Sequence, residues 1–294
     1  MDALPHKAGF VNIIGKPNVG KSTLMNALVG ERLSIITAKA QTTRHRIAGI
    51  LSGPNFQIIY SDTPGMIKPQ YALQKAMMKA VRGALSDADV LLWVVDARDK
   101  TIDVDLKGVL ERHAAPVLLL VNKVDLVEAS VLEEVLEYWA THASVHTMLP
   151  IAALKGYNVP VVLEQLLTHL PEHPPYYPQE MLSDKPERFF AAEIIREKIL
   201  LSYSQEIPYS VEVTIDNFEE TERLVRISAV IYVERQSQKG ILIGHQGSAL
   251  KKVGMAARKD LERLLNKSVF LEQHVKVLPR WRQKSQWLQQ FGYV

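Results

Sequence analysis

One stretch of the sequence has the residue types and the spacing that bind a diphosphate. Residues 15–22 read GKPNVGKS and match the pattern G-x-x-x-x-G-K-S/T. The glycines let backbone N–H groups close around phosphate oxygens, and the N-terminus of a following helix adds positive potential. In this pattern Lys21 reaches the β- and γ-phosphates, and the Ser22 hydroxyl ligates Mg²⁺. The expected phosphate-binding residues are Gly15, Asn18, Val19, Gly20, Lys21, Ser22 and Thr23.

A second motif, DTPG at residues 62–65, follows the β-like run FQIIYS. An aspartate that ends a strand beside the phosphate-binding loop can hold Mg²⁺ through water, so Asp62 joins Ser22 as a candidate metal ligand. The N–H of Gly65 can meet the γ-phosphate, which would let this loop respond to hydrolysis. Taken alone, DTPG is also an ordinary Pro-Gly turn.

A third motif, NKVD at residues 122–125, follows the run VLLLV. The Asp125 carboxylate can accept the N1–H and the exocyclic N2–H₂ of guanine as a bidentate pair, which adenine cannot offer. Asn122 can brace the phosphate-binding loop, and the Lys123 stem can pack on the base. Three motifs in this order, each at the end of a β-like run, predict a guanine-nucleotide site.

The order and spacing of these motifs resemble the small-GTPase family of P-loop NTPases. In that family a further motif, Ser-Ala-Lys or Ser-Ala-Leu, follows the next strand, and the matching residues here are Ala152, Ala153 and Leu154. The serine that orders the loop is missing. The family contact to guanine O6 comes from a backbone N–H, so the resemblance implies that Ala153 provides it.

The polar run QTTR at residues 41–44 precedes the β-like run that starts at Ile47. A threonine in such a loop closes on Mg²⁺ in the GTP state and releases after hydrolysis. Thr43 is the favoured metal ligand, and Thr42 is the alternative. A third interpretation is a polar loop with no metal contact.

The predicted reaction is attack of water on the γ-phosphate of GTP. Many GTPases orient that water with a glutamine directly after the glycine of the second motif, whereas this chain has Met66. Hydrolysis is therefore expected to be slow or to use another device. The chain resembles GTPases in which an asparagine at the position of Asn18 helps to bind K⁺, which places positive charge near the phosphates. The expected catalytic residues are Lys21, Thr43, Gly65 and Asn18.

Short β-like runs alternate with longer helix-like segments over the first 170 residues. The expected strands are Gly9–Ile14, Ile47–Leu51, Phe56–Ser61, Val90–Asp96, Val117–Asn122 and Thr147–Ile151. Several, such as VLLWVVD, are apolar throughout and suit strands buried on both faces of a sheet. The alternation predicts an α/β fold with a doubly wound, mostly parallel sheet of the P-loop NTPase kind. A proline-rich stretch then predicts a stiff linker, so the expected parts are residues 1–173, 174–189 and 190–294.

The pattern changes after the linker. AAEIIREKILLSY and Ser248–Leu265 predict helices, whereas Ser210–Ile215, Leu224–Val233 and Ser268–Val277 predict strands. Residues Lys239–Ile243 form a short apolar run, and Arg280–Phe291 form a basic, aromatic tail that is expected to be helical. This order of elements is typical of a C-terminal α+β KH domain of type II.

The C-terminal block of residues 235–294 is basic, with 12 Lys and Arg against 3 Asp and Glu, an excess of +9. Such a block is a candidate footprint for a polyanion, and a solvated helix face is the alternative. Within it, GHQG at residues 244–247 has the G-x-x-G pattern of the KH loop, whose backbone approaches single-stranded RNA closely. The expected RNA-binding residues are Gly244, His245, Gln246, Gly247, Lys251 and Lys252, with Arg258 as a further phosphate contact.

The whole pattern resembles the Era family of bacterial GTPases. The segments that carry the resemblance are GKPNVGKSTLMNALVG, KAQTTRHRI, DTPG, NKVD and ILIGHQGSALKKVG. The resemblance implies GTP or GDP and Mg²⁺ as ligands, binding to the 3′ end of 16S ribosomal RNA and a role in assembly of the 30S ribosomal subunit. It also implies a cytoplasmic protein that associates peripherally with the inner membrane.

Composition narrows the class of protein further. The absence of cysteine excludes disulfides and thiolate metal sites and favours a reducing cytosol. No run approaches 18 uncharged apolar residues, so no membrane span is expected. The protein is also expected to be a monomer. Two rival functions stay open. One is a tRNA-modification or iron-transport GTPase whose second domain binds protein, and the other is a binding module with a vestigial nucleotide site.

Overall fold

The computed structural model describes residues 5–293, so residues 1–4 and 294 of the expected terminal domains lie outside it. The described chain divides into two compact units. The first contains the residues up to Ser34 together with Thr43–Pro69 and Met77–Asp184. The second contains Lys185 onward and two earlier segments, Ile35–Thr42 and Gln70–Ala76. The sequence analysis did not anticipate that these two segments pack with the C-terminal part of the chain.

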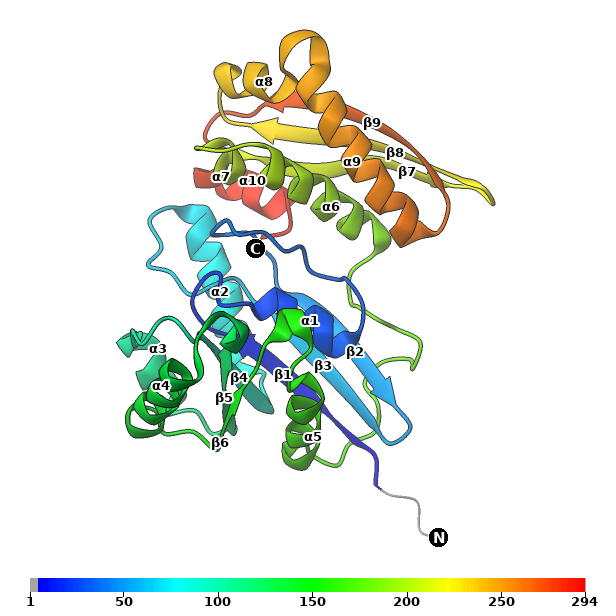
Figure 1. Cartoon of the computed structure of the whole chain (residues 1–294). Helices are drawn as coiled ribbons and strands as arrows, with labels where there is room; N and C mark the ends of the chain where they lie inside the picture. The colour runs from blue at the N-terminus through cyan, green and yellow to red at the C-terminus, as the bar shows by residue number, and fades with distance from the viewer. Residues whose placement is uncertain (1–4, 294) are drawn as a thin grey trace. The chain divides into compact units, whose positions relative to one another are not determined.

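The first unit is built on a six-stranded sheet in the order β2-β3-β1-β4-β5-β6 (Figure 1). Its strands are β1 (Lys7–Ile14), β2 (Ile47–Gly53), β3 (Phe56–Asp62), β4 (Val90–Asp96), β5 (Val117–Asn122) and β6 (Thr147–Pro150). Only the pairing of β2 with β3 is antiparallel among the pairs described. This confirms the predicted P-loop NTPase class with a mostly parallel sheet.

The helices of this part follow the strands as the βαβ alternation predicts. They are α1 (Lys21–Val29), α2 (Ala72–Ser86), α3 (Val104–Leu110), α4 (Ala129–His142) and α5 (Val159–His169), with short 3₁₀ turns η1 (Val124–Leu126) and η2 (Ala153–Lys155). Every residue of β5 is buried, so both faces of the central sheet are covered. On α4, Trp139 packs edge-on against Trp93 of β4 with 5.2 Å between ring centroids.

The proline-rich segment is hydrogen-bonded to the sheet of the first unit. Gln57 of β3, only 1% exposed, accepts from the N–H groups of Tyr176 and Tyr177 at 2.7 and 2.9 Å and donates to the Tyr177 carbonyl at 2.8 Å. Further along, the Ile50 N–H of β2 donates to the Leu182 carbonyl at 2.8 Å. The segment is therefore a strap along this sheet up to Asp184.

The second unit contains a three-stranded sheet in the order β7-β8-β9. Its elements are α6 (Glu187–Ser202), α7 (Ile207–Ser210), β7 (Glu212–Glu220), β8 (Leu224–Val233), α8 (Gln236–Ile243), η3 (His245–Gly247), α9 (Ser248–Leu265), β9 (Ser268–Val277), η4 (Trp281–Gln283) and α10 (Ser285–Gln290). β7 and β8 are antiparallel, and β8 and β9 are parallel. Apolar residues of α6, α8 and α9 pack on the sheet to form its core.

Two elements of the second unit differ from the sequence predictions. The strand expected at Ser210–Ile215 starts two residues later and continues to Glu220, beyond a bulge near Asn217. The apolar run Lys239–Ile243, which was predicted only as an apolar run, is the end of helix α8. The predicted helical tail is a 3₁₀ turn followed by the short helix α10. The acidic second half of β7 has low strand propensity, which explains why its pairing with β8 was missed.

The C-terminal tail is part of the second unit's core. Trp281 is fully buried, and its Nε1 donates to the Ser210 carbonyl at 2.9 Å. The Tyr293 hydroxyl donates to Glu212 Oε2 at 2.6 Å, and the Phe291 ring lies 5.2 Å from that of Tyr232. Among residues 5–293, no helix is both long and apolar enough to cross a membrane.

Replacing Gln57 by alanine should release the strap from β3. The change removes the partner of two part-buried N–H groups and one part-buried carbonyl, so we expect the free energy of unfolding to fall by about 1–3 kcal/mol. Urea unfolding measures this loss, and limited proteolysis should cut residues 171–184 faster. Gln179→Ala, at an exposed position of the same strap, is the control. Equal stability and equal cleavage in both variants would contradict the strap.

Candidate nucleotide site and nucleic-acid interface

The phosphate-binding loop connects β1 to α1, and its glycines are required by its backbone. Gly15 has φ +148°, and a Cβ there would lie 2.3 Å from the Val94 carbonyl oxygen. Gly20 has φ +105°, and a Cβ there would lie 2.2 Å from Asn122 Nδ2. Any other residue would therefore collide with the neighbouring strand ends. The close approach leaves a loop of backbone directly before the N-terminus of α1, which suits an anion.

The Lys21 side chain is hydrogen-bonded to the backbone of this loop. Its Nζ donates to the carbonyl oxygens of Gly15 at 3.1 Å and Lys16 at 2.8 Å, and the residue is 6% exposed. Burial lowers the pKa of Lys21 to about 8, although the nearby Asp62 opposes the shift. A buried ammonium group that is held only by carbonyl oxygens is well placed to gain from phosphate oxygens. Val19 lies buried in the same loop, Asn18 is exposed, and Thr23 is in the first turn of α1.

Three hydroxyl and carboxylate groups from different elements converge beside the loop. Ser22 Oγ donates to Asp62 Oδ2 at 2.6 Å, and Thr43 Oγ1 lies 2.9 Å from Ser22 Oγ and 3.3 Å from Asp62 Oδ2. Burial raises the pKa of the Asp62 carboxyl, while the Ser22 hydrogen bond and the Lys21 charge oppose the rise. Its Oδ1 is buried with no hydrogen-bond partner among the described residues. Hard oxygen donors around such a carboxylate fit Mg²⁺.

Thr42, the alternative to Thr43, points elsewhere. Its Oγ1 donates to the Lys39 carbonyl at 2.6 Å and lies 2.6 Å from Thr37 Oγ1. The structure therefore brings Thr43 to Asp62 and leaves Thr42 within the second unit. We accordingly retain Thr43 as the candidate metal ligand.

The DTPG loop lies against the phosphate-binding loop. The Met66 N–H donates to the Gly15 carbonyl at 3.2 Å, and a Cβ on Gly65 would come within 2.7 Å of the Pro17 backbone. The Thr63 hydroxyl donates to the Ile13 carbonyl at 2.8 Å and anchors the start of this loop to β1. Gly65 is thus within reach of the place where a γ-phosphate would lie, and Met66 offers only a thioether there.

Asn122 connects the phosphate-binding loop to the loop after β6. Its Nδ2 donates to the Val19 carbonyl at 2.8 Å, and its Oδ1 accepts from the Ala153 N–H at 3.0 Å. The Ala153 N–H, to which the family resemblance assigns the contact with guanine O6, therefore already has a partner in Asn122. A buried amide oxygen needs a donor, and the Ala153 N–H supplies it. Ala152 is buried beside it, whereas Leu154 is 77% exposed.

Asp96, at the end of β4, is a site residue that the sequence analysis missed. Lys123 Nζ lies 2.7 Å from Asp96 Oδ2 and also donates to the Asn18 carbonyl at 2.6 Å. Although burial opposes ionisation, hydrogen bonds from Arg98 and Lys123 hold the pKa of Asp96 well below its usual range. The carboxylate therefore fixes the Lys123 stem beside the loop. Its signal in the sequence was its position at the end of a buried strand.

Asp125 lies in η1, directly after Lys123, and its side chain is exposed. Lys123 has φ +65°, which turns the chain sharply after β5. The position beyond the carboxyl end of a parallel strand is where ligands bind in α/β sheets. Asp125, Lys123 and the Ala153 loop thus gather at one edge of the sheet, where the sequence analysis placed the guanine base.

The G-x-x-G loop joins α8 to α9 in the second unit. Gly244 has φ +73°, and a Cβ there would lie 2.6 Å from Ala249 Cβ, whereas Gly247 has φ +77° with open space around it. His245 and Gln246 are exposed, and Gln246 adopts the left-handed conformation with φ +48°. No side chain caps the N-terminus of α9. Its first N–H, that of Ser248, donates to the His245 carbonyl, so an anion would meet the N–H groups that follow it in the first turn.

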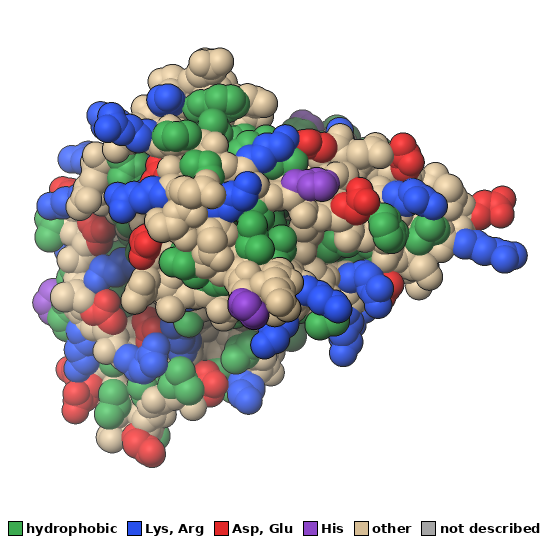
Figure 2. All heavy atoms as spheres, turned by 90° about the horizontal axis from the view of Figure 1, so that it is seen from above, with side chains coloured by type: hydrophobic (Ala, Val, Ile, Leu, Met, Phe, Trp, Pro, Cys, Tyr) green, Lys and Arg blue, Asp and Glu red, His purple; other side chains and the backbone are tan. Residues whose placement is uncertain are grey.

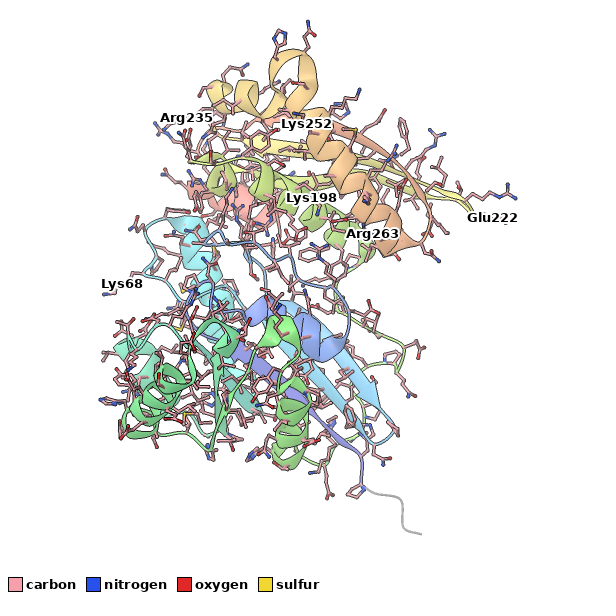
Figure 3. The ribbon with its side chains drawn as sticks, viewed as in Figure 1. Lys68, Lys198, Glu222, Arg235, Lys252 and Arg263 are labelled. Carbon is pink, nitrogen blue, oxygen red and sulfur yellow. The ribbon has the colours of Figure 1, made fainter. Side chains whose placement is uncertain are left out.

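The basic residues of the second unit are unequally placed. Lys251 and Lys252 are exposed near the N-terminal end of α9, which starts at Ser248 directly after the loop, and Lys252 is labelled in Figure 3. Arg258 lies about 15 Å along α9 from the start of that helix and pairs with Glu262 at 3.7 Å, so it is not brought to the loop. Lysine and arginine side chains lie between exposed apolar side chains on the face seen from above (Figure 2).

Two protein-family models match the chain. Residues 10–123 match the family described as 50S ribosome-binding GTPase, and residues 206–282 match the KH domain. The first range contains the phosphate-binding loop and ends within the base motif, after Lys123, and the second contains the G-x-x-G loop.

Two solved structures are similar over nearly the whole chain. One is Era in complex with MgGDPNP and nucleotides 1506–1542 of 16S ribosomal RNA, with 38% identity and a TM-score of 0.92, covering 98% of this chain and 99% of that one. The other is a substituted Era from Aquifex aeolicus bound to GDP·AlF₄⁻, with 37% identity, the same TM-score and the same coverage.

Proposed function

The chain belongs to the Era family of GTPases, and on that premise we propose that it binds the 3′ end of 16S ribosomal RNA and acts in assembly of the 30S ribosomal subunit. It is a GTPase that hydrolyses GTP to GDP and phosphate, with GTP or GDP and Mg²⁺ as ligands. The observation that carries the proposal is that one chain combines the convergence of Ser22 and Thr43 on Asp62 with a G-x-x-G loop between two helices.

The residues of the nucleotide site have different roles in GTP hydrolysis. Lys21, released from the carbonyls it now contacts, stabilises the charge that develops on the β- and γ-phosphate oxygens. The Gly65 N–H binds the γ-phosphate, and Thr43 closes the switch loop over it. Ser22, Thr43 and Asp62 would hold Mg²⁺, which would supply positive charge at the phosphates. Met66 cannot orient water by hydrogen bonding, so intrinsic hydrolysis is slow.

Base selection rests on the loops after β5 and β6. Asp125 accepts the two guanine donors, and Lys123 packs on the base while Asp96 fixes its ammonium group. The Ala153 N–H already donates to Asn122, so its contact with guanine O6 is a shared, three-centre bond.

RNA binding depends more on the backbone geometry of the G-x-x-G loop than on charged side chains between its two glycines. Gly247 leaves open space for a nucleotide, the uncapped start of α9 presents N–H groups, and Lys251 and Lys252 stand one turn away to contact phosphates. The KH fold of the second unit disfavours the rival in which this part binds protein.

The proposal also covers the oligomeric state, the cellular location and the use of K⁺. We propose that the protein acts as a monomer in the cytoplasm. Peripheral association with the inner face of the cell membrane is a further proposal that rests on the family resemblance alone. We also propose that Asn18 contributes to K⁺ binding, because the neighbouring Met66 leaves hydrolysis without a polar side chain at that position.

Asp125→Asn should change the base preference of the site. The amide presents a donor where guanine also has one, so we expect GTP affinity to fall about a hundredfold and affinity for xanthosine triphosphate to rise. Competition binding with labelled GDP measures both. Asp105→Asn, an exposed change in α3, is the control. Unchanged guanine preference would remove Asp125 from the base site.

Gly247→Asp should weaken RNA binding without a clash, because nothing lies near its Cβ. We expect at least about tenfold weaker binding of an RNA with the sequence of the 16S 3′ end, since the new carboxylate repels phosphate. Gly247→Asn is the matched control, because asparagine has the same shape, tolerates positive φ and carries no charge. GTP hydrolysis without RNA should not change. RNA affinity equal to that of the unsubstituted protein would reject the RNA-binding role of the loop.

Replacing NaCl by KCl at equal ionic strength should accelerate hydrolysis by about tenfold if Asn18 helps to place a potassium ion near the phosphates. Single-turnover GTP hydrolysis measures the effect. Asn18→Gly, which keeps the left-handed backbone at φ +63°, should lose the difference between the two salts. Equal rates in both salts for the unsubstituted protein would refute the role of Asn18.

A further inference from the structure

The switch segment Ile35–Thr42 is a compact turn that packs with the second unit. The Lys39 N–H donates to Thr37 Oγ1 at 3.1 Å, and Thr42 Oγ1 donates to the Lys39 carbonyl. Gln41 adopts φ +59°, and its Oε1 accepts from the Tyr71 hydroxyl at 3.1 Å. These contacts give the segment a defined shape, so it can be held as a unit.

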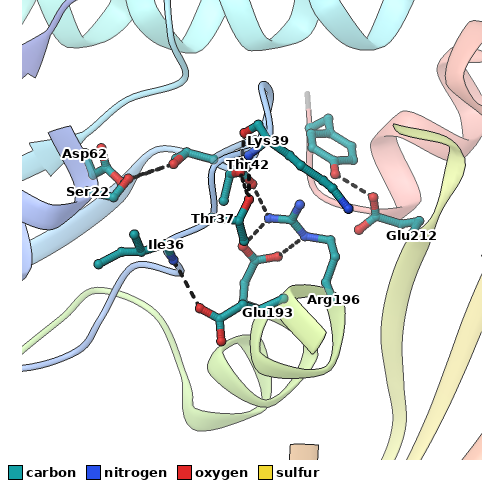
Figure 4. A network of polar contacts seen from close by, with 12 residues as sticks. Ser22, Ile36, Thr37, Lys39, Thr42, Asp62, Glu193, Arg196 and Glu212 are labelled. Carbon is teal, nitrogen blue, oxygen red and sulfur yellow. Dashed lines mark hydrogen bonds and ion pairs between the residues drawn. The ribbon is translucent and has the colours of Figure 1, made fainter. Parts of the chain in front are cut away.

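Helix α6 holds this turn at three points, and Figure 4 draws the contacts made by Ile36 and by Arg196. Glu197 Oε1 accepts from the Ile36 N–H at 3.1 Å, near the start of the turn. Lys39 Nζ donates to the carbonyls of Leu200 and Tyr203, at the C-terminal end of the helix. A cation at this end of a helix is stabilised by the unpaired carbonyls there. The third point, at the end of the turn, is made by Arg196.

Arg196 is preorganised for its contact with the turn. Its Nε and Nη2 donate to the two oxygens of Glu193 at 2.7 and 2.6 Å, and Nη2 also donates to the Thr42 carbonyl at 2.5 Å. Both side chains are buried. Burial disfavours the guanidinium charge, but Glu193 more than offsets this and raises the pKa of Arg196 above its usual value. A fork–fork pair of this kind fixes the guanidinium plane, so the contact with Thr42 has little freedom.

The Thr42 carbonyl belongs to the peptide bond that leads to Thr43. Because this peptide unit is planar, fixing the carbonyl direction also fixes the direction in which the Thr43 N–Cα bond leaves it. The Thr43 hydroxyl, one residue on, lies 2.9 Å from Ser22 Oγ and 3.3 Å from Asp62 Oδ2. The Arg196 guanidinium is therefore linked to Thr43, a candidate metal ligand, by one hydrogen bond and one peptide unit.

We propose that Arg196 is a positioning residue for GTP hydrolysis, which holds the Thr42 carbonyl so that the Thr43 hydroxyl faces Ser22 and Asp62. In this proposal Arg196 acts through Thr43, because its guanidinium donates to Glu193 and to the Thr42 carbonyl. The inference rests on the proposed function, in which Thr43 closes the nucleotide site. Glu193 supports the same contact by orienting Arg196.

The first test is structural and needs no nucleotide. In the full-length protein, Arg196→Met removes the donor to Thr42, so we expect amide hydrogens of residues 35–43 to exchange about tenfold faster. Glu193→Gln, a milder change that keeps the size of the side chain, should accelerate the same amides by less. Arg188→Met, at an exposed position of the same helix, should leave them unchanged. Unchanged exchange in Arg196→Met would overturn the proposal.

The second test is a double-mutant cycle on hydrolysis. Arg196→Met alone should lower kcat about tenfold with little change in KM, and Arg196→Lys should restore part of the loss. Thr43→Ala should also lower kcat, and the variant that carries both Thr43→Ala and Arg196→Met should be no slower than Thr43→Ala. Additive losses would show that Arg196 acts by another route. If Thr43→Ala hydrolyses GTP normally, the proposed role of Thr43 fails, and the inference fails with it. Failure of RNA binding in Gly247→Asp bears on neither outcome.

Discussion

The nucleotide site depends on two opposite charges that are buried together, one at the start of α1 and the other at the end of β3. Lys21 and Asp62 are both almost fully buried, and each shifts the pKa of the other toward the charged form against the effect of burial. Unpaired buried charges would be strongly destabilising, so each is also bound by neighbouring polar groups. Carbonyls of the phosphate-binding loop bind the ammonium group, and Ser22 and Thr43 bind the carboxylate. In the proposed function, phosphate and Mg²⁺ would take the place of these partners.

That requirement explains why the loop tolerates so few residue types. The Gly15 and Gly20 backbones approach Val94 and Asn122 so closely that no side chain fits, and Asn122 in turn reaches the loop after β6. The loop, the base motif and the Ala153 turn are thus one connected arrangement on the carboxyl edge of the sheet. A change at one of these positions is transmitted to the others by direct contact.

The parts of the site that could be predicted from the sequence are those in which function resides in a short continuous motif. Residues 15–22, 62–65 and 122–125 each follow an apolar run that is recognisable as a strand, and parallel strands bring their ends together. Asp96 escaped prediction because its role depends on Lys123, which is distant in sequence. The partner of the Ala153 N–H depends on packing, since a buried amide must find a donor wherever the fold provides one.

The same distinction applies to the fold. β4, β5, β8, α9 and β9 agree with the sequence predictions to the residue, because each has an uninterrupted period or apolar run. β7 was predicted too short, because its outer half is acidic and exposed and is a strand only by pairing with β8. The grouping of Ile35–Thr42 with the second unit had no local signal at all, since it follows from three separate contacts with α6.

The strap formed by the proline-rich segment has a consequence for the solubility of the first unit. β2 is an edge strand, and its backbone would otherwise offer unpaired N–H and C=O groups to any other extended chain. The bond from Ile50 to Leu182 and the bridge between Gly49 and Ser183 occupy that edge. At the opposite edge, β6 has only four residues and ends in Pro150. Both borders of the sheet are thus protected against intermolecular strand pairing, one by a covering segment and the other by its brevity, which lowers the risk of aggregation.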